Sequence, residues 1–166
     1  NGVKQPLHMR RRLKVMLFAD VKNYSRLSDE QIPAFLGVFL RKVARLIARS
    51  DNKPEAWHTW GDGLYLVFND VVDGAAFSLG LLECIERSHW ERQGLPEDTT
   101  IRVGLHAGPV YPALDPITRR DNFFGTHVNR AARIEQATTP GCVFTSQETA
   151  ALLAATPGHS FVCDYV

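Results

Sequence analysis

The order of the apolar segments constrains the fold of this chain more than any other feature. Residues 13–21 (LKVMLFADV) and 99–111 (TTIRVGLHAGPVY) are rich in apolar and β-branched residues, as buried strands are. Between them, two strand-like runs flank the turn at 61–63, where an Asp-Gly pair predicts a β-hairpin. A helical pattern follows the first strand and another follows the hairpin. The order βαββαβ is that of a ferredoxin-like domain.

The helical segments and the remainder of the chain complete this prediction. Residues 28–31 (SDEQ) form a capping-box pattern of Ser28 with Gln31, and the helix after them places Phe35, Phe39 and Val43 on one face. The other expected segments are a helix at 73–94, a proline-broken polar loop at 112–122, a helix at 125–138, a short strand at 141–146, a short helix at 147–155 and a last strand at 159–166.

We therefore expect the mixed α/β (α+β) class: an extended ferredoxin-like βαββαβ sandwich with a C-terminal αβαβ extension. Residues 1–166 are expected to form a single domain. Because the chain ends on a strand-like run, a fragment truncated at the C-terminus is an alternative interpretation.

Composition and charge exclude several classes of function. The chain has 166 residues, 45% of them apolar and 22% charged, and a net charge of +1. These values are typical of a soluble globular protein and give no field that attracts nucleic acid or a membrane surface. No apolar run reaches the ~18 residues of a membrane span, and no secretory signal is present. The basic cluster of Arg10, Arg11, Arg12 and Lys14 is interpreted as the solvated start of the first strand.

The three cysteines have no ligand-like spacing. Cys84, Cys142 and Cys163 are scattered and odd in number, which favours reduced, buried thiols in a cytoplasmic protein over disulfides or a zinc site.

Two aspartates interrupt strand-like runs. Asp20 lies near the end of the first strand, and Asp62 lies in the hairpin turn. In the predicted topology the two side chains approach each other, and two close carboxylates repel unless a proton or a cation lies between them. Hard divalent ions take oxygen ligands of this kind. Either residue alone is more simply a cap or a turn residue, but the pair predicts a metal site.

Four segments resemble a known family. They are MLFADVKNYS (16–25), WGDGLYLVF (60–68), RVGLHAGPV (102–110) and FFGTHVNRAARIE (123–135). In this order, spanning about residues 13–145, they resemble the class III nucleotidyl cyclase catalytic domain. The V-N-x-A-A-R pattern with a following glutamate is the most specific of them. The resemblance implies an extended ferredoxin-like enzyme that turns a nucleoside triphosphate into a 3′,5′-cyclic nucleotide and pyrophosphate, as a homodimer with shared active sites.

The resemblance also implies roles for individual residues. Asp20 and Asp62 would bind two divalent ions, Mg²⁺ or Mn²⁺, with the backbone carbonyl of Val21 as a further ligand. Asn129 and Arg133, which lie on one helical face, would come from the partner subunit, position the ribose and stabilise charge on the phosphates. For Arg133 the alternative is a surface ion pair within its own helix.

Phosphates would be held without a P-loop or a G-x-G-x-x-G fingerprint, since the chain has neither. The resemblance assigns this role to the backbone around Asn23, Tyr24 and Ser25, although the family usually has glycine at position 23. His106 and His127 are interpreted as structural.

The base-reading positions depart from the family. Adenylate-forming members use a lysine and an aspartate where this chain has His58 and Asn122, and the glutamate and cysteine of guanylate-forming members are also absent. Asparagine both donates and accepts, and a neutral imidazole does either, so several bases fit. Strand alternation puts Trp60 on the same side as His58. Trp60 either fills the space of a second purine ring, which favours a pyrimidine, or packs in the core.

Three functions follow from these departures. ATP is the expected substrate, and a pyrimidine cyclase that makes cUMP or cCMP from UTP or CTP is the first alternative. A non-catalytic nucleotide-binding or regulatory module is the second, because the phosphate-binding lysine that family members carry just after the last strand is not reached before Val166. An RNA-binding ferredoxin-like domain is not supported, because the basic-aromatic signature is absent.

Overall fold

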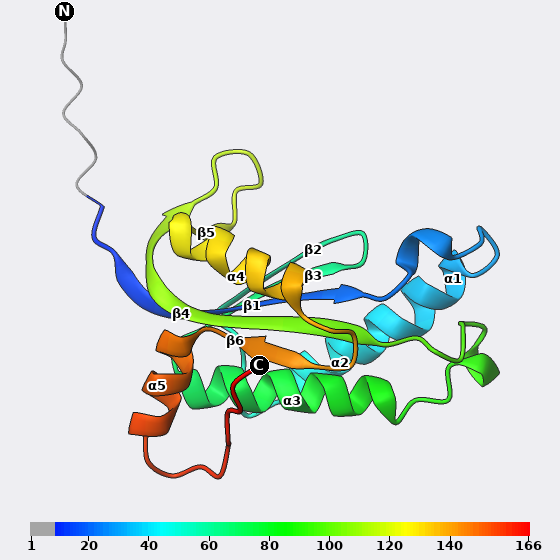
Figure 1. Cartoon of the computed structure of the whole chain (residues 1–166). Helices are drawn as coiled ribbons and strands as arrows, with labels where there is room; N and C mark the ends of the chain where they lie inside the picture. The colour runs from blue at the N-terminus through cyan, green and yellow to red at the C-terminus, as the bar shows by residue number, and fades with distance from the viewer. Residues whose placement is uncertain (1–8) are drawn as a thin grey trace, which may run out of the picture.

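The computed structural model describes residues 9–166 and has a six-stranded sheet at its centre (Figure 1). The strand order is β2-β3-β1-β4-β5, and β6 pairs with β4. The strands are β1 (Arg12–Val21), β2 (Ala56–Trp60), β3 (Gly63–Phe68), β4 (Ile101–Leu114), β5 (Asp121–Phe124) and β6 (Val143–Thr145). Strand β1 is antiparallel to both β3 and β4, and β2 is antiparallel to β3. This is the ferredoxin-like arrangement, so the predicted fold is confirmed.

The helices form layers on the two faces of the sheet. They are α1 (Ile32–Ala34), the π-helical segment η2 (Phe35–Leu40), α2 (Arg41–Arg49), α3 (Val71–Glu86), α4 (Thr126–Ala137) and α5 (Gln147–Ala155), with short 3₁₀ turns η1 (Tyr24–Arg26) and η3 (Glu91–Gln93). Figure 1 shows α3 and α5 on one side of the sheet and α4 on the other. The face that carries α4 is therefore less covered by helices than the opposite face.

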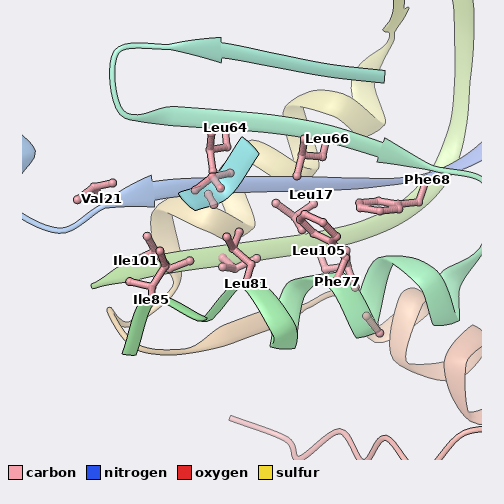
Figure 2. Packing of buried hydrophobic residues seen from close by; sticks show 14 of the residues in the cluster. Leu17, Val21, Leu64, Leu66, Phe68, Phe77, Leu81, Ile85, Ile101 and Leu105 are labelled. Atoms are coloured by element: carbon pink, nitrogen blue, oxygen red, sulfur yellow. The ribbon is translucent and has the colours of Figure 1, made fainter. Parts of the chain in front are cut away.

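Strand β1 contributes to two cores, which explains its unbroken apolar run. Val15, Leu17 and Ala19 face the larger core beneath α3, whereas Met16 and Phe18 face the smaller core beneath α4. A strand covered on both faces lacks the polar alternation of a half-exposed strand. Figure 2 shows the larger core, where Leu17 and leucines of β3 lie above the side chains of α3.

Two glycines of β4 allow α4 to lie directly on the sheet. A Cβ atom at Gly104 would lie 2.3 Å from the backbone nitrogen of Glu135, and one at Gly108 would lie 2.3 Å from Nδ1 of His127. Neither position has room for a side chain. This contact fixes which face of α4 is turned toward solvent.

The region predicted as a loop at 112–122 is largely a second hairpin, so that prediction is wrong. Strand β4 continues to Leu114 and pairs with β5. The turn between them is closed by Asp115, whose carboxylate accepts N–H bonds from Ile117 at 2.8 Å and Thr118 at 3.1 Å. The predicted helix at 73–94 also ends earlier, at Glu86.

The strand predicted at 159–166 is wrong as well, because residues 157–166 have no regular structure. His159 bonds to the carbonyl of Leu153 through Nε2 at 2.7 Å and receives the N–H of Phe161 at its Nδ1. Val162 and Tyr165 are exposed. The segment thus bonds locally and to the end of α5 instead of pairing with a strand.

Two surface predictions also need correction. Lys14 is buried, where it contacts Glu55 and Asn69 and lies over the ring of Phe123, while Arg10, Arg11 and Arg12 are exposed as predicted. Cys163 is exposed and Cys84 and Cys142 are half-buried, so the thiols are free but not fully buried. Within residues 9–166 no helix is long and apolar enough to cross a membrane.

Candidate active site

The hairpin between β2 and β3 places an acid beside the end of β1. Its two-residue turn consists of Gly61 and Asp62, one position earlier than the Asp-Gly pair suggests, and Trp60 pairs with Gly63 across it. Gly61 has a φ of +61°, which the first position of a type II′ turn requires. The ring of Trp60 covers Gly63, where a Cβ would lie 2.7 Å from the indole nitrogen. The turn is therefore tight, and Asp62 is held at its tip.

The structure brings Asp20 and Asp62 together at what we call the acidic end of the site (Asp20, Val21 and Asp62). Asp62 accepts the backbone N–H of Val21 at 3.3 Å. Burial raises the pKa of Asp62, and the hydrogen bond and charge of the neighbouring Asp20 carboxyl add to this effect, so that the pKa is about 7. A proton or a cation between the two carboxylates relieves this repulsion.

The donor set at the acidic end fits a hard divalent cation. Both side chains present oxygen atoms, which Mg²⁺ and Mn²⁺ prefer. Within residues 9–166 no group of three or more His, Cys, Asp or Glu side chains gathers as a metal site. An ion here would need further oxygen ligands, and a backbone carbonyl and substrate phosphates can supply them.

Arg102 and Glu135 join the acidic end, and the sequence did not identify either as a functional residue. Arg102 stands opposite Asp20 in the β1–β4 register, and its Nη2 donates to Asp20 Oδ2 at 2.9 Å. Its Nε lies 2.5 Å from Oε1 of Glu135 on α4. The contact between Arg102 and Asp20 could have been predicted only from the strand register, because the two residues are 82 positions apart in the sequence.

The segment predicted to bind phosphate begins with a left-handed residue just after β1. Asn23 has a φ of +61°, the left-handed conformation that glycine adopts freely and asparagine tolerates. The residues that follow, Tyr24–Arg26, form a 3₁₀ turn. The ring of Tyr24 packs against Phe35 at 4.8 Å, whereas Asn23 and Ser25 are exposed. Asn23 therefore adopts a conformation that is also open to glycine.

The outward face of α4 carries the pair Asn129 and Arg133. Both are exposed, while Ala131 and Glu135 are buried against the sheet. Within residues 9–166 no ion pair involves Arg133, so the surface pair considered above is not formed; its neighbour Arg130 pairs with Glu148 at 2.8 Å. The guanidinium of Arg133 is thus available to a ligand or a second subunit.

His58 and Trp60 share the face of the sheet that carries α4, as strand alternation predicts. Together with Asn122 they form what we call the aromatic end of the site. His58 stacks on Tyr65 with ring centroids 5.9 Å apart, and its buried Nε2 has no hydrogen-bond partner within residues 9–166. Asn122 lies on β5, where its Oδ1 accepts the N–H of Phe123 at 2.8 Å.

Tyr65 lies between the two predicted base readers. Its ring stacks on His58, and its hydroxyl is 3.5 Å from the carbonyl of Phe123, next to Asn122. Trp60 is 57% exposed and lies 6.1 Å from the ring of Phe18, so it does not pack in the core of this chain. The aromatic end therefore presents the open ring of Trp60, and behind it lies the buried His58 Nε2, which has no hydrogen-bond partner within residues 9–166.

A buried polar network anchors the start of α4. His106, which is 1% exposed, contacts Ser146 Oγ through Nδ1 at 2.7 Å and His127 Nδ1 through Nε2 at 2.9 Å. Burial and, to a smaller extent, the nearby charges of Arg130 and His127 lower the pKa of His106 to about 4. This placement agrees with a structural role for both histidines.

Comparison with known proteins gives one family. The family model described as "Adenylate and Guanylate cyclase catalytic domain" matches residues 11–165. Guanylate cyclase 2G of Mus musculus is 38% identical over 157 residues, covering 87% of this chain and 14% of that protein. The adenylate cyclase of Mycosarcoma maydis is 26% identical over 154 residues, covering 80% of this chain and 6% of that protein.

Solved structures show the same fold. The adenylyl cyclase CyaB from P. aeruginosa superposes with a TM-score of 0.77 at 21% identity, covering 89% of this chain and 83% of that one. The chain spans less than a quarter of the length of the curated relatives it matches. Because these relatives are named for both adenylate and guanylate, the comparisons do not distinguish the base.

Proposed function

The chain belongs to the family of adenylate and guanylate cyclase catalytic domains, and on that premise we propose that it converts a nucleoside triphosphate into the 3′,5′-cyclic nucleotide and pyrophosphate. The observation that carries this proposal is the meeting of Asp20 and Asp62 at the end of β1. If the site had decayed, either acid would be free to change, so the presence of both side by side supports a working cation site.

The reaction joins the ribose 3′-oxygen to the α-phosphate and expels pyrophosphate. Two divalent ions, Mg²⁺ or Mn²⁺, held by Asp20, Asp62 and the carbonyl of Val21 would activate the attacking oxygen and neutralise the leaving group. The backbone N–H groups around Asn23, Tyr24 and Ser25 would bind phosphate oxygens. The left-handed turn at Asn23 supports this role, because it bends the backbone at the position where glycine is usual.

We propose a homodimer in which each site is shared. The partner's Asn129 would orient the ribose, and the partner's Arg133 would stabilise charge that develops on the phosphates. Their exposure on α4, with no ion pair of Arg133 within residues 9–166, supports delivery to another subunit. The free thiols suit a reducing, cytoplasmic setting, which belongs to the same proposal.

ATP is the first candidate among substrates. The amide of Asn122 and the buried His58 Nε2, which has no partner within residues 9–166, could together match the amino group and ring nitrogen of adenine. The exposure of Trp60 supports UTP or CTP as the second candidate, because an indole beside the base would occupy the space of a second purine ring. A non-catalytic nucleotide-binding module is the remaining alternative.

The test is incubation of the protein with each of the four nucleoside triphosphates and Mn²⁺, followed by mass spectrometry of the products. We expect a cyclic nucleotide from at least one of them, and its base identifies the substrate. Nucleotide binding without product, in a protein extended beyond residue 166, would favour the non-catalytic module.

A further inference from the structure

The acidic end contains more charge than the two predicted metal ligands. Arg102 contacts Asp20 at 2.9 Å through Nη2 and approaches Glu135 at 2.5 Å through Nε. The carboxylates of Asp20 and Glu135 thus flank one guanidinium, and the carboxyl of Asp62 lies beside that of Asp20. The planar fork of arginine allows it to bridge two carboxylates at once, which a lysine ammonium does less well.

Glu135 is fixed in place by the packing of α4. Its side chain is 11% exposed, and its backbone nitrogen lies 2.3 Å from where a Cβ at Gly104 would be. One turn later, the hydroxyl of Thr138 donates to the carbonyl of Ile134 at 2.7 Å and lies 3.4 Å from that of Val103. These contacts hold the backbone of α4 close to β4 and so place Glu135 beside Arg102.

The consequence is electrostatic. Alone beside Asp20, the charge of Arg102 would cancel one of the two negative charges that attract a divalent ion. Glu135 adds a buried negative charge on the other side of the same guanidinium and so restores the net charge of the cluster from −1 to −2, counting both aspartates as ionised. At such separations and in a partly buried setting, one charge has a measurable effect on a bound ion.

We propose that Glu135 is a positioning residue for the metal site: it holds Arg102 against Asp20 and offsets its charge, so that the two aspartates keep their affinity for divalent cations. This inference rests on the proposed function only in placing the ion at Asp20 and Asp62. It gives α4 two roles, since its outward face carries Asn129 and Arg133 and its inward face supports the metal ligands of its own subunit.

The test measures Mn²⁺ binding to the nucleotide-free protein, from the free-ion signal in electron paramagnetic resonance. Substitution Glu135→Gln keeps the size of the side chain and removes its charge. Substitutions of groups that support metal ligands typically weaken binding by about 10–100-fold. Because Glu135 acts through Arg102, we expect the half-saturating Mn²⁺ concentration to rise by about five- to tenfold. Glu83→Gln, which removes an equal charge from the exposed face of α3, is the matched control and should leave binding unchanged.

A double-mutant cycle separates positioning from a general effect of charge. In an Arg102→Met background, the same Glu135→Gln change should weaken Mn²⁺ binding by less than about threefold, because only the direct effect of the Glu135 charge on the ion remains once the side chain that it holds in place is gone. Equal effects in the two backgrounds, or no effect in either, would overturn the proposal. Where Glu135→Gln does not fold, Glu135→Asp keeps the charge and retracts it from Arg102, and unchanged Mn²⁺ binding in that folded variant would overturn it equally.

The outcome of this test is distinct from that of the proposed function. If the unmodified protein and its Asp20→Asn variant bind Mn²⁺ equally weakly, the metal site itself is wrong. If Asp20→Asn abolishes binding and Glu135→Gln does not alter it, only the role of Glu135 is wrong. The KM for the nucleotide at saturating Mn²⁺ should stay within about twofold in Glu135→Gln, because Glu135 is expected to act on the metal ligands through Arg102 and not to contact the nucleotide.

Discussion

At the acidic end of the site the charged side chains are tied to one another, whereas at the aromatic end the polar groups are free or turned back on the chain. Asp62 accepts the Val21 N–H, Asp20 contacts Arg102, and Arg102 contacts Glu135. By contrast, His58 Nε2 has no partner within residues 9–166, and Trp60 is 57% exposed.

This difference shows which part of the site forms within a single chain. Aspartates that share a cation need close, rigid placement, which adjacent strands and a two-residue turn provide. A base-binding surface needs a wall on its open side, and within residues 9–166 no side chain covers Trp60 fully. The acidic end is therefore organised within the subunit, and we expect the aromatic end to be completed by a nucleotide and a second subunit.

The largest expected effect comes from the acidic end. Asp62→Asn should lower kcat/KM by about 10³-fold or more, since charge stabilisation by bound ions is worth several kcal/mol. The free energy of unfolding should stay the same or rise, because the substitution removes a carboxylate crowded against Asp20. Steady-state kinetics and urea unfolding check the two parts, with the exposed Asp51→Asn as the control. A variant that loses stability together with activity would mean that Asp62 is chiefly structural.

The outward face of α4 should come next. Arg133→Ala is expected to lower kcat by about 10²–10³-fold, the usual loss for one preorganised donor to a transition-state charge. Arg130→Ala is the matched control on the same helix, because Arg130 already pairs with Glu148, and it should change kcat by less than about twofold. Equal losses in the two variants would show that α4 needs its positive charge in general and not Arg133 in particular.

The buried His106 should make the free energy of unfolding depend on pH, and this dependence limits the pH range in which activities at the two ends can be compared. His106 has a pKa of about 4 in the folded protein and about 6.5 when unfolded, so the unfolded state binds more protons between these values. The free energy of unfolding should be highest above pH 6.5 and fall by up to about 3 kcal/mol as the pH drops toward 4. Urea unfolding at several pH values measures this, and His106→Gln should flatten the curve. An equal slope in that variant would assign the acid sensitivity to other groups.

The smallest effect is expected at the aromatic end. The double substitution His58→Lys with Asn122→Asp should raise kcat/KM for ATP relative to the other nucleoside triphosphates by about tenfold. This factor corresponds to about 1.4 kcal/mol, which lies in the range of about 1–3 kcal/mol for one hydrogen bond to a charged or buried group. A panel of four substrates checks it. If the ratios among the four do not change, these positions do not face the base, and the substrate assignment must be sought elsewhere.

The sequence predicts a structural feature when a local pattern encodes it, and fails when the feature depends on contacts between distant segments. The continuous apolar run of β1 and the tight turn at Asp62 are local, so the ferredoxin-like order and the approach of the two aspartates could be predicted. The burial of Lys14 could not, because its partners Glu55 and Asn69 are fixed only when β1 and β3 pair.

The same reasoning explains the two wrong segments. Strand β5 was missed because residues 112–122 are polar and contain prolines, which favours a loop. Pairing with the end of β4 nevertheless makes β5 a strand. The strand expected at 159–166 had a suitable pattern, but within the part of the chain that the structure describes no strand pairs with it. Arg102 belongs to a segment that the family resemblance singled out, and yet its role depends on a register that no local pattern reveals.

The most direct measurement of a site shared between subunits is complementation. Asp20→Ala protein, which lacks the acidic end, is mixed with Arg133→Ala protein, which lacks the α4 arginine, and cyclic nucleotide formation is assayed after subunit exchange. Each protein alone should be inactive, and the equimolar mixture should regain roughly a quarter of the unmodified activity, because half of the dimers are mixed and each mixed dimer has one intact site. A mixture as inactive as its components, although size-based analysis of tagged chains shows mixed dimers, would contradict the shared site.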